Sequence, residues 1–132
     1  MPPSTSTRRA AREPAELYAI IQDAVNAADI DAFVDAHDDD ATVVIPPDGT
    51  IAHGHRQIRA GIVALLELRP RLTLVPSTAL RSDGLALAHG RWHLTVVDDG
   101  SRVELNGLGT MVSRRGADGA WRVILDNPLT GP

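Results

Sequence analysis

The sequence contains no cysteine and no lysine, since all 13 of its basic residues are arginines. Without thiols, the chain cannot form disulfides, bind metals through thiolates or use a cysteine nucleophile. Without lysine, it cannot form a Schiff base with a carbonyl substrate. Glycine-rich phosphate-binding loops are also missing, so we expect no organic cofactor and no metal. No long apolar run follows the early arginines, which argues against a secretory signal or a membrane anchor and favours a cytoplasmic protein.

The composition otherwise fits one globular domain, with 132 residues of which 43% are hydrophobic. Three arginines before residue 13 form a short basic leader, 1–12, which we expect to be disordered. The remaining domain, 13–132, holds ten arginines and all 17 acidic residues, a formal charge of −7. A body this acidic, with no basic stripe, predicts that neither nucleic acid nor an anionic membrane is a partner.

Apolar residues at helical spacing predict helices in the first half of the chain. Pro14 suits the first turn of one helix, and Asp29 can cap a second. The predicted helices cover 14–28, 29–37 and about 55–68, with a short strand at 42–45 that ends at the turn of residues 46–49. His37 falls on the apolar face of the second helix, where a hydrogen-bonded core histidine is the favoured interpretation and contact with a ligand the alternative.

From residue 70 onward, turn sequences separate stretches that are typical of strands. The predicted strands are 71–81, 85–97, 102–115 and 120–126. Helices followed by consecutive strands indicate an α+β fold in which the helices cover one face of an antiparallel sheet.

Several local motifs resemble the nuclear-transport-factor-2-like superfamily, which includes ketosteroid isomerases and SnoaL-like cyclases. They are Ala28–Phe33, Asp39–Val43 and Gly54–Arg59, and the ending Asp118–Arg122 with Asp126–Pro128 is similar to the SgcJ/EcaC branch of SnoaL-like proteins. The resemblance implies a cone-shaped, cystatin-like fold of three N-terminal helices on a curved antiparallel sheet. It also implies an apolar pocket and a homodimer formed through the outer face of the sheet.

The catalytic residues of ketosteroid isomerases are mostly absent at the matching positions. Ile45 stands where that family has its aspartate base, and the oxyanion-hole acid would fall near Gly109 and Thr110. Tyr18 lies about one helical turn before the position of the family's tyrosine. Isomerisation of the steroid type would therefore lack both its base and its acid.

The limonene-epoxide-hydrolase relatives use two aspartates and an arginine to activate water. Arg91 matches the arginine, but His93 and Val123 replace the aspartates. The tyrosine and asparagine that help to position the water are replaced by Val43 and Ile45. Epoxide hydrolysis by that mechanism is not expected.

His89, Arg91 and His93 alternate along one predicted strand and share a face. If the resemblance sets the orientation, this row faces the pocket, with His93 as a proton shuttle and Arg91 holding a developing oxyanion. Trp92, Leu94 and Val96 would then face outward into the dimer contact. The alternative is that the polar row faces solvent. The other expected pocket residues are Gln22, Val25, Val43, Ile45, His89, Thr95, Leu105, Gly107, Trp121, Val123 and Leu125.

Two further features complete the sequence-based expectations. His53 and His55 could contact a metal, but no carboxylate motif accompanies them. Asp126 is off the alternation of Trp121, Val123 and Leu125, so we expect it to anchor the C-terminal turn.

Three function classes remain open. The favoured one is a cofactor-free isomerase, cyclase or hydratase that acts on a small apolar carbonyl or polyketide-like compound. A non-catalytic protein that binds a small apolar or anionic ligand would use the same pocket. An assembly module would fill the pocket with its own side chains and act through the outer sheet face.

Overall fold

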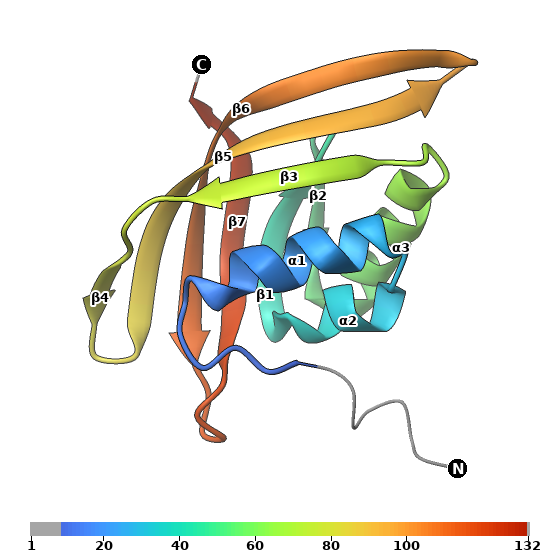
Figure 1. The fold of residues 1–132 in the computed structure, drawn as a ribbon. Coiled ribbons are helices and arrows are strands. Elements are labelled where there is room, and N and C mark those ends of the chain that lie inside the picture. The colour runs from blue at the N-terminus through green and yellow to red at the C-terminus, as the bar shows by residue number, and fades with distance from the viewer. Residues whose placement is uncertain (1–8, 132) are drawn as a thin grey trace.

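In the computed structural model, which describes residues 9–131, three helices lie on one side of a curved, seven-stranded sheet (Figure 1). The helices are α1 (Glu16–Asn26), α2 (Ile30–Asp35) and α3 (Gly54–Leu66). The strands are β1 (His37–Ile45), β2 (Thr50–His53), β3 (Arg71–Pro76), β4 (Leu80–Ser82), β5 (Leu85–Asp98), β6 (Ser101–Arg115) and β7 (Trp121–Gly131). The sheet order is β2-β1-β7-β6-β5-β3, and β4 pairs with the start of β5. The predicted α+β architecture is confirmed.

The helices form where the sequence predicts them: α1 and α2 are shorter at both ends, and α3 begins one residue earlier and ends two residues earlier than predicted. Asp29 caps α2, because its Oδ1 accepts a hydrogen bond of 3.1 Å from the Ala32 amide. The apolar stripes of α1 and α3 are buried against the sheet, with Leu17 on α1 and Ile58 on α3 among the most buried side chains. Burial of these stripes supplies most of the stabilisation of helices this short.

The region between α2 and α3 contains more strand than the sequence predicts. His37 begins β1 instead of ending a helix, and β1 runs to Ile45. The turn after Ile45 leads into β2, a strand that the sequence analysis missed. The three aspartates that follow His37 are acceptable in a strand because they lie exposed or half-buried.

The sheet is mixed instead of wholly antiparallel. β1 and β7 are paired in parallel. The long connection between them brings the chain back beside β1 in the same direction. β7 also continues to Gly131, beyond the predicted end. The predicted strand 71–81 is divided into β3 and β4 after Pro76, which has no amide hydrogen to continue a ladder.

Strand β5 turns its apolar residues toward the helices. Trp92, Leu94 and Val96 are buried there, whereas His89, Arg91 and His93 lie exposed on the outer face. The predicted orientation of this strand was therefore wrong. At the edge of the sheet, side-chain amides of α1 bind the backbone of β3, because the Leu74 amide donates to Gln22 Oε1 at 2.9 Å and Asn26 bonds both backbone groups of Leu72.

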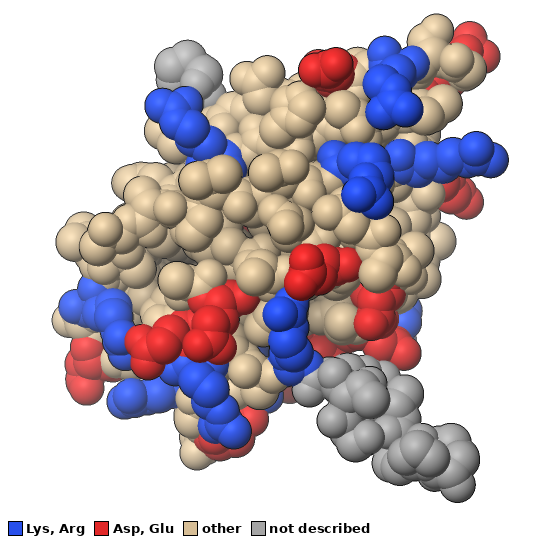
Figure 2. All heavy atoms as spheres, viewed as in Figure 1, with Lys and Arg blue, Asp and Glu red and all other residues tan. Residues whose placement is uncertain are grey.

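The end of the predicted leader packs on the domain. Arg9 forms an ion pair of 2.7 Å with Asp23, and the backbone of Ala11 bridges to Trp121. The earlier part of the leader, 1–8, lies outside the described residues. Within residues 9–131, no helix is long and apolar enough to span a membrane. Figure 2 shows arginine and acidic side chains intermixed on the face in view.

His37 is a buried, hydrogen-bonded core histidine, as the favoured interpretation predicted. Its Nδ1 donates to the Phe33 carbonyl oxygen at 2.7 Å, and only 1% of the residue is exposed. Burial lowers its pKa to about 4, and the nearby His55 acts in the same direction. The imidazole is thus neutral in the folded protein at neutral pH.

Because folding depresses the His37 pKa, the stability it contributes is present above the unfolded value of about 6.5 and is lost as the pH falls toward 4. We expect this residue to reduce the free energy of unfolding by roughly 2–3 kcal/mol between pH 7 and pH 4. Urea denaturation at several pH values tests this. His37→Asn should be less stable than wild type at pH 7, but its free energy of unfolding should fall less between pH 7 and pH 4. An equal decrease in the free energy of unfolding of both proteins over this pH range would contradict the expectation.

Candidate functional site

An apolar pocket with an open volume of about 90 Å³ lies between the helices and the inner face of the sheet. Its walls come from all three helices and from five of the strands, and almost all of the lining is apolar. The only ionisable side chains among the lining residues are those of Tyr18 and Asp126. The full lining is Tyr18, Ile21, Val25, Phe33, Ile45, Pro46, Leu65, Leu72, Leu74, Gly90, Trp92, Leu94, Gly109, Thr110, Met111, Asp126 and Pro128.

Two glycines on neighbouring strands create the floor of this pocket. Gly90 on β5 pairs directly with Gly109 on β6, so this part of the inner face carries no side chains. The Tyr18 ring occupies the space over Gly90, because a Cβ at that position would lie only 2.7 Å from Tyr18 Cε1. A larger residue at position 90 would therefore displace the Tyr18 ring.

Asp126 reaches the pocket because of a β-bulge in β7. Ser113 and Val112 of β6 pair with Val123 and Leu125, so Ile124 is the extra residue. The bulge reverses the alternation of β7, which exposes Leu125 to 51% and turns Asp126 inward, opposite the buried Met111. The expectation that Asp126 lies off the pocket was therefore wrong.

Asp126 is half-buried, and its carboxyl group lies among the apolar residues that line the pocket. Among the described residues, no hydrogen bond or ion pair to it is found, and its oxygens keep some accessible surface, because no fully buried side-chain oxygen in this part of the chain lacks a partner. Burial in this apolar environment raises its pKa to about 7. Protonated and ionised forms are thus both present near neutral pH, so the group can either donate or accept a proton.

The Tyr18 hydroxyl is the second polar group of the pocket. Burial, and to a smaller extent the negative charge of Asp126, raise the pKa of Tyr18 to about 12. The phenol therefore keeps its proton in the pH range in which Asp126 titrates. It can act as a hydrogen-bond donor toward an oxygen atom bound between the two residues.

The polar row predicted to act in catalysis lies on the opposite side of the sheet. His93 contacts Glu104 at 3.2 Å, and His89 contacts Thr110 at 3.1 Å. Arg91 and His93 border an outer groove of about 260 Å³ instead of the apolar pocket. Their predicted roles as oxyanion holder and proton shuttle depended on the inward orientation, which β5 gives to Trp92 and Leu94.

Of the other predicted pocket residues, only Val25 and Ile45 line the pocket. Gln22 is engaged with the backbone of β3, and Gly107 lies under the Trp92 ring. The remaining residues lie in the core, at the opposite end of the sheet or on its outer side: Val43, Val123, Thr95, Leu105, Trp121, His89 and Leu125.

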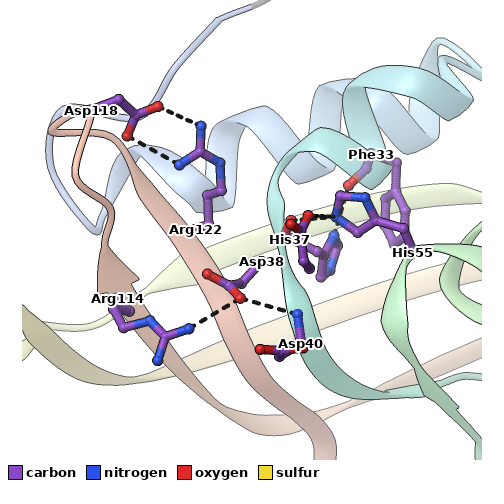
Figure 3. Close-up of polar contacts among 9 residues, drawn as sticks. Phe33, His37, Asp38, Asp40, His55, Arg114, Asp118 and Arg122 are labelled. Carbon is purple, nitrogen blue, oxygen red and sulfur yellow. Dashed lines mark hydrogen bonds and ion pairs between the residues drawn. The ribbon is translucent and has the colours of Figure 1, made fainter.

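A larger, polar cleft of about 530 Å³ lies at the other end of the sheet, between α1, α2 and β7. Its charged groups pair with protein groups, as Arg122 does with Asp118 at 2.7 Å and Asp38 with Arg114 at 3.1 Å (Figure 3). His55 Nε2 donates to the His37 carbonyl oxygen at 2.7 Å. Because these partners lie within the protein, the smaller pocket is the better candidate site: its Tyr18 hydroxyl and Asp126 carboxyl form no hydrogen bond within residues 9–131.

The histidines considered as metal contacts are occupied by protein groups. His53 Nδ1 lies 2.8 Å from Thr42 Oγ1, and His55 is held by the backbone of β1. Within residues 9–131, no three histidine, aspartate or glutamate side chains form a group that could hold a metal ion.

Comparison with known proteins agrees with this architecture. Residues 18–124 match the SnoaL-like domain family. The chain belongs to that family. Among curated proteins, none matches the sequence. The match to the SnoaL-like family confirms the predicted nuclear-transport-factor-2-like relationship.

Solved structures share the fold at low sequence identity. A ketosteroid isomerase-like protein from Erwinia carotovora atroseptica is 17% identical with a TM-score of 0.74, covering 86% of this chain and 89% of its own. A protein from Thiobacillus denitrificans, described as a putative calcium/calmodulin-dependent protein kinase type II association domain, is 22% identical with a TM-score of 0.72, covering 93% and 100%. An NTF2-like protein with a cystatin-like fold from Novosphingobium aromaticivorans is 20% identical with a TM-score of 0.70, covering 89% and 80%.

Proposed function

We propose that this SnoaL-like protein is a cofactor-free acid–base enzyme, an isomerase, cyclase or hydratase acting on a small, largely apolar carbonyl or polyketide-like compound. The observation that carries the proposal is the Asp126 carboxyl group, which lies in an apolar pocket without a protein partner and has a pKa of about 7. A buried acid of this kind is expensive to keep unless it has a chemical task.

In the proposed reaction, ionised Asp126 removes a proton from the carbon next to a carbonyl group. The C–H electron pair moves toward the carbonyl oxygen, and the Tyr18 hydroxyl stabilises the enolate with a hydrogen bond. Asp126 then delivers a proton to another carbon, or to the oxygen, and while it is protonated it can exchange that proton with the solvent; no oxidant or cofactor is consumed. Both residues lie among the pocket walls, and the charge of Asp126 influences the pKa of Tyr18.

The size of the pocket restricts what enters it. Its 90 Å³ is well below the roughly 300–1,000 Å³ that is usual for drug-sized ligands. We therefore propose that only the reacting carbonyl end is enclosed, while the rest of the substrate lies at the mouth.

Proton exchange tests this proposal before a natural substrate is known. Small cyclic ketones and enones are incubated with the protein in D₂O, and loss of the α-proton signal is followed by NMR. We expect catalysed exchange for at least one compound, and Tyr18→Phe should slow it about tenfold or more. Binding without exchange would instead support the non-catalytic ligand-binding alternative. If the protein shows no binding and no exchange with any compound, the pocket proposal is contradicted.

We also propose a homodimer through the outer face of the sheet. Ile51 is 67% exposed and Leu125 is 51% exposed, and both border an outer groove of about 350 Å³ with Val44 and Val112. Trp92 and Val96, which the sequence analysis expects at the dimer contact, are buried on the other face of the sheet. The Thiobacillus denitrificans neighbour, which is described as an association domain, has the same fold.

Light scattering tests the dimer. The unmodified protein should be dimeric at micromolar concentration, and the pair Ile51→Glu and Leu125→Glu should yield folded monomers, because charges would then lie in the apolar contact. The matched pair Val63→Glu and Leu80→Glu alters exposed apolar residues away from this groove and should stay dimeric. A monomer for the unmodified protein would overturn the proposal.

A further inference from the structure

Trp92 makes an unusual contact between strands that are not neighbours. It lies on β5, and its indole Nε1 donates a hydrogen bond of 2.6 Å to the carbonyl oxygen of Pro128 on β7. β6 lies between these two strands in the sheet, so the indole must cross its inner face. Trp92 is buried, with 8% exposed, and lines the same pocket as Asp126.

Two glycines of β6 make this crossing possible. A Cβ at Gly107 would lie 3.1 Å from the Trp92 indole, and a Cβ at Gly109 would lie 2.8 Å from Pro128 Cα. The second contact is with backbone, which cannot move aside as a flexible side chain does. Any larger residue at position 109 would therefore push the segment that follows Asp126 away from the sheet.

The segment held by the indole pairs irregularly with β6. Asn127 pairs with Thr110 and Gly131 with Leu108, so that residues 128–130 stand opposite the single residue Gly109. Pro128 has no amide hydrogen for the ladder. The Trp92 hydrogen bond is a side-chain contact that holds the chain two residues after Asp126.

We infer that Trp92 is a positioning residue for Asp126, because its indole N–H fastens the Asp126–Pro128 segment against the pocket and so limits how much of the carboxyl group water can reach. The inference rests on the proposed function, in which Asp126 is the acid–base group. When the indole N–H is missing, the Pro128 carbonyl loses its partner and must turn toward water. The Asp126 carboxyl then becomes more solvated, and its ionised form is less disfavoured.

The test measures the titration of Asp126 directly. Carboxyl carbons are labelled with ¹³C-aspartate, and Asp126→Asn identifies the signal. Trp121→Phe leaves Trp92 as the only tryptophan, which can then be replaced during expression by an isosteric analogue that carries sulfur in place of the indole N–H. We expect the analogue to lower the Asp126 pKa by about one pH unit or more, from near 7 toward 4.

Two comparisons separate positioning from a general loss of packing. Trp121 is even more buried than Trp92 but lies outside the apolar pocket, so Trp121→Phe alone should leave the Asp126 pKa unchanged even though it destabilises the fold. Gly109→Ala, which displaces Pro128 without altering Trp92, should lower the pKa as the analogue does.

The outcomes also distinguish this inference from the function on which it rests. An analogue-bearing protein that keeps the wild-type titration would overturn the role of Trp92, while the acid–base proposal would stand. If the unmodified protein already titrates near 4, the acid–base proposal itself fails, whatever the variants do.

Discussion

Replacing Asp126 by asparagine is expected to slow the exchange of substrate α-protons by about 10²–10⁴-fold, because the amide can no longer accept the proton. Asparagine keeps nearly the same shape, so binding of the ketone should change much less. In the unmodified protein the exchange rate should rise about tenfold per pH unit below 7 and level off above it, since Asp126 acts as a base only when it is ionised. Because the pKa of Tyr18 is about 12, its ionisation should cause no further change in the exchange rate near neutral pH.

The measurement is the NMR exchange assay at saturating ketone from pH 5 to pH 9. Asp118→Asn is the matched control, because Asp118 is paired with Arg122 at the other end of the sheet and should keep the wild-type rate. An unchanged rate in Asp126→Asn would assign any observed exchange to another group and remove Asp126 from the mechanism.

The same carboxyl group should also make the fold less stable as the pH rises. Its pKa is raised on folding, so the folded state binds the proton more tightly than the unfolded chain, whose aspartate has a pKa of about 3.9. The stabilisation is present below the unfolded value and is lost as the pH rises through about 7. Between pH 5 and pH 8, we expect Asp126 to lower the free energy of unfolding by roughly 2–3 kcal/mol.

Urea denaturation of wild type and Asp126→Asn at the two pH values isolates this contribution, because His37 and the other titrating groups are common to both proteins. The variant should gain stability relative to wild type as the pH rises, whereas Asp83→Asn, in an exposed turn, should follow wild type. A difference between variant and wild type that is independent of pH would mean that the Asp126 carboxyl is solvated.

The helices could be predicted because their signals are local. Asp29 provides a cap, and the apolar residues of α1 and α3 repeat at the helical period over several turns. The parallel pairing of β1 with β7 could not be predicted in the same way, because it joins residues such as His37 and Val123 that lie far apart in sequence. No local pattern specifies such a pair.

The site was missed for two physical reasons. The alternation of β5 offers one face with Arg91 and His93 and another with Trp92 and Leu94, and the choice between them depends on burying the indole and leucine under the helices. The position of Asp126 depends on a bulge, which shifts the alternation by one residue and leaves no clear mark in the sequence. Val25 and Ile45, which the family resemblance places in the pocket wall, are among the residues that line the apolar pocket.

The central claim is that an aspartate without a protein partner titrates near neutral pH inside the apolar pocket. Its most direct test is the ¹³C NMR titration of Asp126 in the unmodified protein, assigned by the signal that disappears in Asp126→Asn. The account predicts a midpoint at about pH 7. A midpoint near 4, the value of an ordinary exposed aspartate, would show that water reaches the carboxyl group and would contradict the account.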